Sequence, residues 1–211
     1  MRPSYPINLD VTGRTILIVG GGAVAARKAR RLIEAGARRV RCVAPAFCDE
    51  LPPEVDRVRG TYCPDHLTGA TLVFAATDRA DVNEAVVRDA HARNLLVNRA
   101  DGDDEEPGDF AVPAKLRRGD VTVTVTAGSP TLAAMIRDRL ADLFDPRWAQ
   151  IAEAMRGLRP WIKSAGVDVA TRRTIFRELA TEEALALLSD RGPAGLREWL
   201  LARHPQLNQD R

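Results

Sequence analysis

The chain has 211 residues, of which 45% are apolar and 28% are charged, a composition typical of a globular protein with one compact domain or two small ones. The net charge of +2 is too small to indicate nucleic acid or a membrane surface as a partner. No run approaches the roughly 18 apolar residues of a membrane-spanning helix. We therefore expect a soluble protein with neither nucleic acid nor membrane as a partner.

The cysteines indicate a reducing compartment. Cys42, Cys48 and Cys63 are odd in number and show no Cys-x-x-Cys spacing, so the sequence indicates neither a disulfide framework nor a zinc site. The run "TILIVGGGAVAA" superficially resembles a signal-peptide core, but three glycines interrupt it and the helical "ARKARR" follows. We expect a cytoplasmic protein.

The first hundred residues alternate between two patterns. Short runs rich in β-branched residues predict buried strands, at 15–20, 39–44, 71–77 and 95–98. The amphipathic segments between them predict helices, from Ala25 to Gly36 and from Asp81 to Asn94. This β-α-β alternation predicts an α/β fold with a doubly wound parallel sheet of the Rossmann type.

The pattern changes after residue 100. Residues 101–109, "DGDDEEPGD", carry six carboxylates and no base and predict a solvated loop. "VTVTVT" at 121–126 predicts a strand. The remainder predicts helices, starting at Pro130 and then at 146–160, 171–189 and 193–203.

These elements predict three parts: a nucleotide-binding Rossmann domain over 1–112, a strand and helix segment over 113–145, and a helical domain over 146–211. The middle segment is too small for much core of its own. We expect it to complete its core in a second subunit, as a dimerisation segment beside the substrate site.

A glycine motif lies where the first strand meets the first helix. Gly20, Gly22 and Ala25 match G-x-G-x-x-[G/A] in the strand-to-helix context that the motif requires. The first glycine permits the tight turn, the second admits a pyrophosphate onto the helix N-terminus, and the small third residue allows close packing. A glycine turn without a ligand is the alternative interpretation.

One expected feature of dinucleotide sites is missing. An Asp or Glu that holds the ribose hydroxyls usually follows the second strand, but here that place reads "CVAPAF". A cofactor that carries a 2′-phosphate stays possible, because three arginines are available nearby to pair with it: Arg38, Arg39 and Arg41. The motif by itself therefore indicates nucleotide binding and no particular reaction.

Five sequence blocks identify a family. "VGGGAVAARKARRLIEAGARRVRCVAP", "FAATDRADVN", "LLVNRAD", "DFAVPA" and "TAGSPTLAAMIRDRL" resemble, in order and nearly in spacing, the precorrin-2 dehydrogenases and the N-terminal part of the siroheme synthases. The resemblance covers roughly residues 4–145. It implies a homodimeric oxidoreductase that uses NAD to convert precorrin-2 to sirohydrochlorin, on the way to siroheme or a cobalt corrinoid. Some members also insert ferrous iron.

The resemblance assigns roles to individual positions. Asp101 falls at the functionally required aspartate, which could accept a proton as hydride leaves the macrocycle. Ser129 matches a serine beside the substrate crevice, and it also suits a helix N-cap. The remaining positions match residues that contact the dinucleotide: Gly20, Gly22, Ala23, Val24, Pro45, Ala46 and Thr77.

The chain departs from the family pattern in three places. The loop after Asn98 is about two residues longer and more acidic than usual, "SGGxSP" is shortened to "TAGSP", and "ATDD" is "ATDR". His66, His91 and His204 show no ligand spacing, so we expect surface roles for them and no metal site. Two alternatives stay open: a bifunctional dehydrogenase and ferrochelatase, and a non-catalytic dinucleotide sensor.

Overall fold

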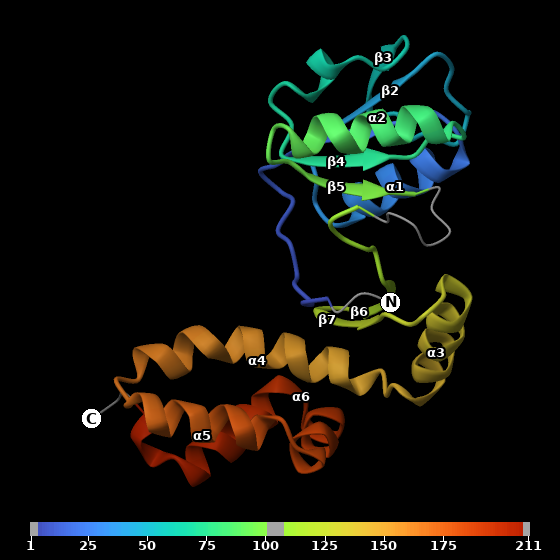
Figure 1. Ribbon diagram of the computed structural model, residues 1–211. Helices are drawn as coiled ribbons and strands as arrows, with labels where there is room; N and C mark the ends of the chain where they lie inside the picture. The colour runs from blue at the N-terminus through green and yellow to red at the C-terminus, as the bar shows by residue number, and fades with distance from the viewer. Residues whose placement is uncertain (1–3, 101–107, 209–211) are drawn as a thin grey trace. The chain divides into compact units, whose positions relative to one another are not determined.

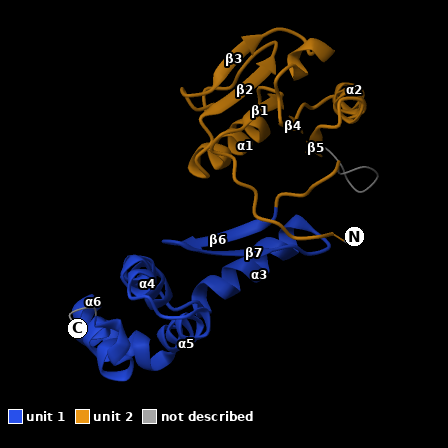
Figure 2. Cartoon of the chain, turned by 90° about the vertical axis from the view of Figure 1, so that its left-hand side faces the viewer, with its two compact units in different colours: residues 1, 113–211 blue, residues 2–112 orange. Residues whose placement is uncertain are grey.

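The computed structural model describes residues 4–100 and 108–208, which divide into two compact units (Figure 2). The N-terminal unit ends at Val112 and the C-terminal unit begins at Pro113. Each unit has a hydrophobic core built from its own residues.

The N-terminal unit is a five-stranded parallel sheet with helices on both faces (Figure 1). Its strands have the spatial order β3-β2-β1-β4-β5, so the direction of winding reverses between β1 and β4. This confirms the predicted Rossmann-type fold. In chain order the elements are β1 (Thr15–Val19), α1 (Ala23–Glu34), β2 (Arg39–Ala44), β3 (Asp56–Arg59), the short 3₁₀ helix η1 (Pro64–Leu67), β4 (Leu72–Ala75), α2 (Ala80–His91) and β5 (Leu96–Arg99).

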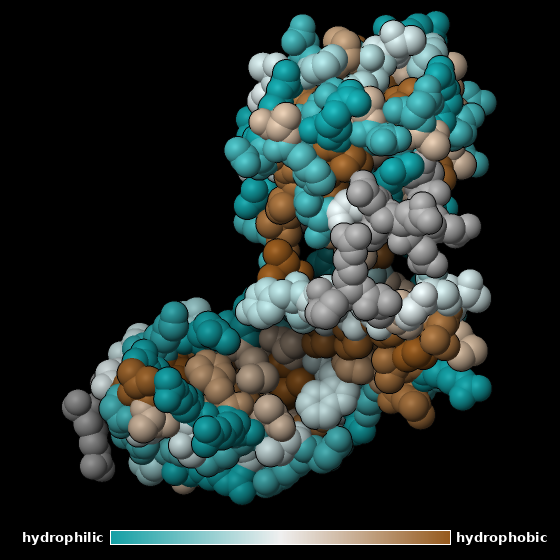
Figure 3. Space-filling view, viewed as in Figure 1, coloured by the Kyte–Doolittle hydropathy of each residue, from teal (hydrophilic) through white to brown (hydrophobic). Residues whose placement is uncertain are grey.

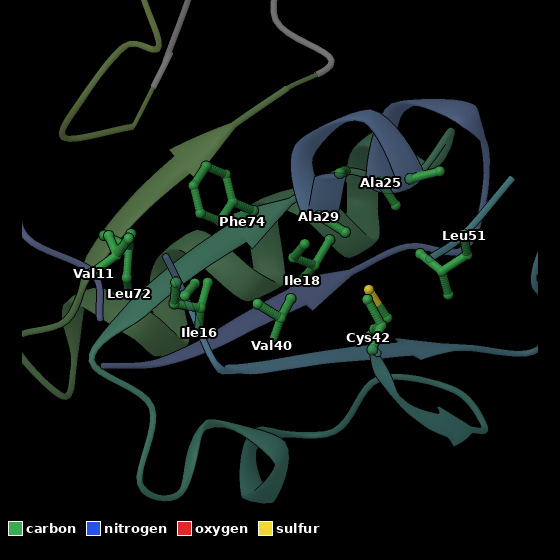
Figure 4. Close-up of a cluster of buried hydrophobic side chains, with 14 residues drawn as sticks. Val11, Ile16, Ile18, Ala25, Ala29, Val40, Cys42, Leu51, Leu72 and Phe74 are labelled. Carbon is green, nitrogen blue, oxygen red and sulfur yellow. The ribbon is translucent and has the colours of Figure 1, made fainter. Parts of the chain in front are cut away.

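Alternate strand residues form the two cores of this unit because successive side chains point to opposite faces of a sheet. On one face the strands pack against three small residues of α1, Ala25, Ala26 and Ala29 (Figure 4). The other face packs against α2. Burial raises the pKa of the Cys42 thiol to about 12, so this cysteine is a neutral core residue.

The edge strand β3 was missing from the sequence prediction. Its residues, "DRVR", are mostly exposed and show no run of apolar side chains. Pairing with β2, from Arg41↔Asp56 to Ala44↔Arg59, defines it instead. A strand at the edge of a sheet can be held by backbone hydrogen bonds while its side chains face water.

The C-terminal unit joins a small antiparallel hairpin to four helices. The hairpin consists of β6 (Ala114–Arg118) and β7 (Val121–Val125), and α3 (Pro130–Leu143) packs on both strands. The helices α4 (Arg147–Ser164), α5 (Val169–Leu179) and α6 (Glu182–Arg203) surround the core, and a short 3₁₀ helix, η2 (Pro205–Leu207), follows. The sequence prediction contained β7 but not β6.

Two sequence expectations for this unit were wrong. The predicted helix over 171–189 is two helices, because α5 ends at Leu179 and Thr181 caps α6, its hydroxyl accepting from the Ala184 N–H at 3.3 Å. His204 is also not a surface residue: its side chain is buried and lies 3.0 Å from Glu178. A carboxylate partner explains how a histidine is accommodated there.

Among the residues that the structure describes, no helix is both long enough and apolar enough to cross a membrane.

Candidate dinucleotide-binding site

Three loops meet at the carboxyl ends of β1, β2 and β4. Gly20 N–H donates to the Val43 carbonyl at 2.9 Å, and Cys48 N–H donates to the Gly21 carbonyl at 2.8 Å. Ala76 N–H donates to the Val19 carbonyl, also at 2.8 Å. The loops that contain the predicted residues Gly20, Pro45, Ala46 and Thr77 are therefore joined at the edge where ligands bind in open α/β sheets.

Gly20 and Gly21 are required by the protein's own backbone. A Cβ on Gly20 would overlap the carbonyl oxygen of Ala76, and a Cβ on Gly21 would overlap the carbonyl oxygen of Ala46. Gly20 also has a φ of 140°, which side-chain-bearing residues rarely adopt. These two glycines are needed for the fold whether or not a ligand is present.

Gly22 has a different environment. A Cβ placed on it would meet no atom of the described chain within 4 Å. It is the N-cap of α1, where none of the described side chains forms a capping bond, and the first turn holds no acid. The N–H groups of Ala23 and Val24 therefore begin a helix whose positive end is open to an anion. This geometry fits the pyrophosphate of a dinucleotide.

The loop after β4 is held by Asn83, a residue that the sequence interpretation did not include. The side-chain oxygen of Asn83 accepts from the Thr77 N–H at 3.1 Å and from the Thr77 hydroxyl at 2.8 Å. Its amide donates to the Thr77 carbonyl at 3.0 Å. Asn83 is completely buried, so a polar residue among the apolar positions of α2 is the sequence signal that marks it.

A cavity of about 420 Å³ adjoins the loop after β2. It is lined by Phe47, Cys48, Asp49, Arg57 and Arg59. Asp49 supplies a carboxylate that the sequence interpretation did not find directly after the strand, and the two arginines lie on β3. Ribose hydroxyls and a 2′-phosphate both have suitable partners in this cavity.

The arginines considered for a 2′-phosphate lie elsewhere. Arg39 and Arg41 belong to the first half of β2, whereas the three loops follow the carboxyl ends of their strands. Arg41 Nε pairs with Asp56 Oδ2 at 2.7 Å, and the Arg39 guanidinium donates to the Gly13 carbonyl.

A half-buried lysine links α1 to β5. Lys28 Nζ donates to Asn98 Oδ1 at 2.7 Å and lies 5.3 Å from the centre of the Phe74 ring. The Asn98 amide in turn donates to the Phe110 carbonyl at 2.7 Å. Burial, followed by repulsion from Arg27 and Arg31, lowers the pKa of Lys28 to about 8.

The chain returning at residues 108–110 is held against β5. Asp109 N–H donates to the Val97 carbonyl at 2.8 Å, and Asp109 Oδ2 accepts from the Val97 N–H at 2.9 Å. Gly108 forms a bridge with Asn98, and a Cβ on this glycine would overlap the Val97 carbonyl oxygen. Both sides of the acidic loop are thus attached to one strand. Asp101 itself lies outside the described residues.

The other predicted substrate residue, Ser129, belongs to the C-terminal unit. It is exposed and caps α3, its hydroxyl oxygen accepting from the Leu132 N–H at 3.1 Å. Within the described residues, no group of three His, Cys, Asp or Glu side chains is arranged to hold a metal ion. His91 lies 3.0 Å from Asp109, and His66 accepts from the Cys63 N–H at 3.0 Å.

The model of a protein family described as "Putative NAD(P)-binding" matches residues 7–114. The chain belongs to this family. The match spans all three loops and α1, so the expected nicotinamide dinucleotide cofactor is confirmed at the level of the family.

Relatives extend the match into the C-terminal unit. A siroheme synthase from Chromobacterium violaceum is 40% identical over 189 residues, which cover 86% of this chain and 39% of that protein. Siroheme synthase 1 from Aeromonas salmonicida is 34% identical over 194 residues, covering 89% of this chain and 41% of the relative. The chain thus spans about two fifths of the length of these curated relatives. The predicted relationship to the siroheme synthases is confirmed.

A solved structure shares the fold. "SirC, precorrin-2 dehydrogenase" superposes with a TM-score of 0.78 at 23% identity, covering 94% of this chain and all of that chain. This similarity includes the Rossmann-type sheet and the hairpin and helices that follow it.

The different surroundings of the glycines lead to a testable prediction. Gly20→Ala is expected to reduce the free energy of unfolding by more than about 2 kcal/mol, because the new methyl group overlaps a backbone carbonyl at a positive φ. Gly22→Ala is expected to cost less than about 1 kcal/mol in stability and to weaken NAD binding at least tenfold, about 1.4 kcal/mol. Urea denaturation and calorimetric titration with NAD measure the two effects. Unchanged NAD affinity in Gly22→Ala would contradict the assignment of the α1 N-terminus.

The lowered pKa of Lys28 leads to a prediction of how the free energy of unfolding depends on pH. Its pKa is about 8 in the folded protein, against an ordinary value of 10.5, so the unfolded chain binds more protons between these values and stability rises with pH there. Relative to Lys28→Met, the wild type should gain up to about 1.4 kcal/mol per pH unit between about pH 8 and pH 10. Urea denaturation at pH 7, 8, 9 and 10 measures this difference. Lys163→Met is the control for loss of one charge, and parallel wild-type and Lys28→Met curves would refute the prediction.

Proposed function

We propose that this chain is an NAD-dependent dehydrogenase that oxidises precorrin-2 to sirohydrochlorin. The observation that carries the proposal is the open N-terminus of α1 at Gly22, in a chain whose similarity to siroheme synthases continues through both units. The oxidation removes a hydride and a proton from the macrocycle. NAD, when bound, supplies the hydride acceptor.

The described residues account for cofactor placement. The N–H groups of Ala23 and Val24 would hold the pyrophosphate, while Pro45 and Ala46 would border the adenosine half. Thr77, held by three hydrogen bonds with Asn83, would border the nicotinamide. Holding the reactants in a fixed orientation lowers the barrier to hydride transfer without covalent chemistry by the protein.

Two residues are proposed to act on the substrate. Asp101 would accept the proton, because a carboxylate following a parallel strand lies at the ligand-binding edge of such a sheet. Ser129 caps α3, and a helix N-terminus attracts carboxylates of the kind that precorrin-2 carries.

The working form is proposed to be a homodimer formed through α3. Large apolar side chains of this helix are exposed to solvent: Leu132 by 42%, Met135 by 49%, Leu140 by 37% and Leu143 by 82%. They recur every three to five residues, which places them along one side of the helix, and apolar surface gathers over α3 in Figure 3. A two-stranded hairpin such as β6–β7 is also marginally stable without further partners. A second copy covering α3 would bury these apolar side chains and give the hairpin a further packing partner.

The compartment is proposed to be the cytoplasm. Cys42, Cys48 and Cys63 are all free thiols, which suits a reducing environment.

The function is tested by anaerobic incubation of the purified chain with precorrin-2 and NAD, following the absorbance of sirohydrochlorin. Product should appear only when NAD is present. Asp101→Ala should lower kcat at least about 100-fold, the usual contribution of a general base, with unchanged NAD affinity. Asp104→Ala, in the same acidic loop, is the matched control and should keep full activity.

The remaining outcomes separate the alternatives. A further spectral change on adding ferrous or cobaltous ion would show a bifunctional chelatase. NAD binding with no product would overturn the dehydrogenase and favour the sensor. Full turnover by Asp101→Ala would remove that residue from the mechanism.

The dimer is tested by sedimentation equilibrium of Leu132→Asp/Met135→Asp. Two charges on the apolar side of α3 should shift the protein from dimer to monomer and raise the dissociation constant at least 100-fold. Val169→Asp is the control, because Val169 is an apolar residue exposed by 54% on α5. Retention of the dimer in the α3 variant, or a monomeric wild type, would overturn this proposal.

A further inference from the structure

A groove of about 500 Å³, widely open to solvent, lies between α4 and α5 in the C-terminal unit. Its rim is basic: five cationic side chains line it, and its described lining contains no carboxylate. These residues are Arg159, Lys163, Arg172, Arg173 and Arg177. We call this feature the α4–α5 groove. It shares no residue with the dinucleotide site, whose residues all belong to the N-terminal unit.

The cations of the groove differ from other arginines of the same unit. Arg147 pairs with Asp145, Arg156 with Asp120, and Arg191 with Glu198, at 2.5, 2.9 and 2.6 Å. None of the five groove residues forms an ion pair with any residue in the described part of the chain. Grouping unpaired like charges around one cavity is unfavourable in itself, and a bound anion would relieve the repulsion.

The groove also has an apolar surface. Phe176 lines it, with the Arg159 guanidinium 4.9 Å from the ring centre, and Val169 and Ala180 are exposed beside it. An ion such as phosphate would use the arginines but not this apolar area. A flat ring carrying several carboxylates would use both, because its face packs on apolar side chains and its carboxylates accept paired hydrogen bonds from arginine.

We propose that the α4–α5 groove binds a flat polycarboxylate macrocycle at a second site, distinct from the site of the reaction. The choice of a macrocycle rests on the proposed function, whose substrate and product are tetrapyrroles with several carboxylates. The volume lies within the range of small-molecule sites and accommodates one edge of such a ring, with the remainder in solvent. The groove would hold substrate or product on the protein before or after turnover.

The test uses uroporphyrin I, a stable fluorescent porphyrin with eight carboxylates, titrated into the purified 211-residue chain. Arg172→Glu/Arg173→Glu reverses two groove charges near the N-terminus of α5, where acidic residues are compatible with the helix dipole. We expect this variant to lose at least 30-fold in affinity and one porphyrin in binding stoichiometry. Arg38→Glu/Arg88→Glu, two exposed arginines of the N-terminal unit, makes the same change in net charge and should stay within threefold of wild type.

Three outcomes would overturn the proposal. Unchanged binding in the groove variant would exclude the site. Equal losses in both variants would indicate a general effect of net charge. Displacement of the porphyrin by a duplex DNA oligonucleotide at comparable or lower concentration, with the same dependence on Arg172 and Arg173, would indicate a nucleic-acid surface instead.

Turnover measured on the same samples separates this inference from the proposed function. The groove variant should keep the wild-type rate of sirohydrochlorin formation at saturating precorrin-2. Porphyrin binding at the groove without any turnover would overturn only the proposed function. Turnover without groove binding would overturn only the second site.

Discussion

The close approach of three backbone segments at the ends of β1, β2 and β4 is the constraint on which the site depends. Gly20 and Gly21 touch carbonyl groups of the neighbouring loops so closely that neither can carry a side chain. Because those contacts hold the loops together, α1 begins directly at the edge of the sheet, and none of the described side chains caps its first N–H groups. The same glycine triplet therefore combines close packing at its first two positions with open space at Gly22.

A hydrogen-bonded pair, Lys28 and Asn98, connects α1 to the neighbouring strand β5. Asn98 is a buried polar residue that accepts from Lys28 and donates to Phe110, so one side chain joins α1, the strand and the chain returning after the acidic loop. Partial burial and the nearby charges of Arg27 and Arg31 lower the pKa of this lysine. A half-buried lysine with a lowered pKa, beside the strand that precedes Asp101 in the sequence, is the kind of perturbed group that concentrates at functional sites.

The C-terminal unit separates two kinds of surface on different helices. Four large apolar side chains of α3 are exposed and suit a second subunit. The facing sides of α4 and α5 carry cations that form no ion pair within the described part of the chain, and these suit an anion. In the same unit, carboxylates neutralise other arginines. The apolar surface and the basic surface therefore suit partners of different chemistry.

The sequence by itself determined the Rossmann-type alternation, the glycine motif and the relationship to siroheme synthases, because buried parallel strands and the strand-to-helix turn impose local patterns of residues. Features held by contacts between distant residues needed the tertiary structure. Strand β3 exists through pairing with β2, Asn83 acquires its role by facing Thr77, and Asp49 reaches the cavity after β2 only because its loop folds back onto Gly21. The basic groove likewise combines residues of α4 and α5 that look like ordinary solvated charges in sequence. The spacing of apolar residues along the sequence indicates which side of a helix or strand is buried. Tertiary packing decides which other element that side contacts.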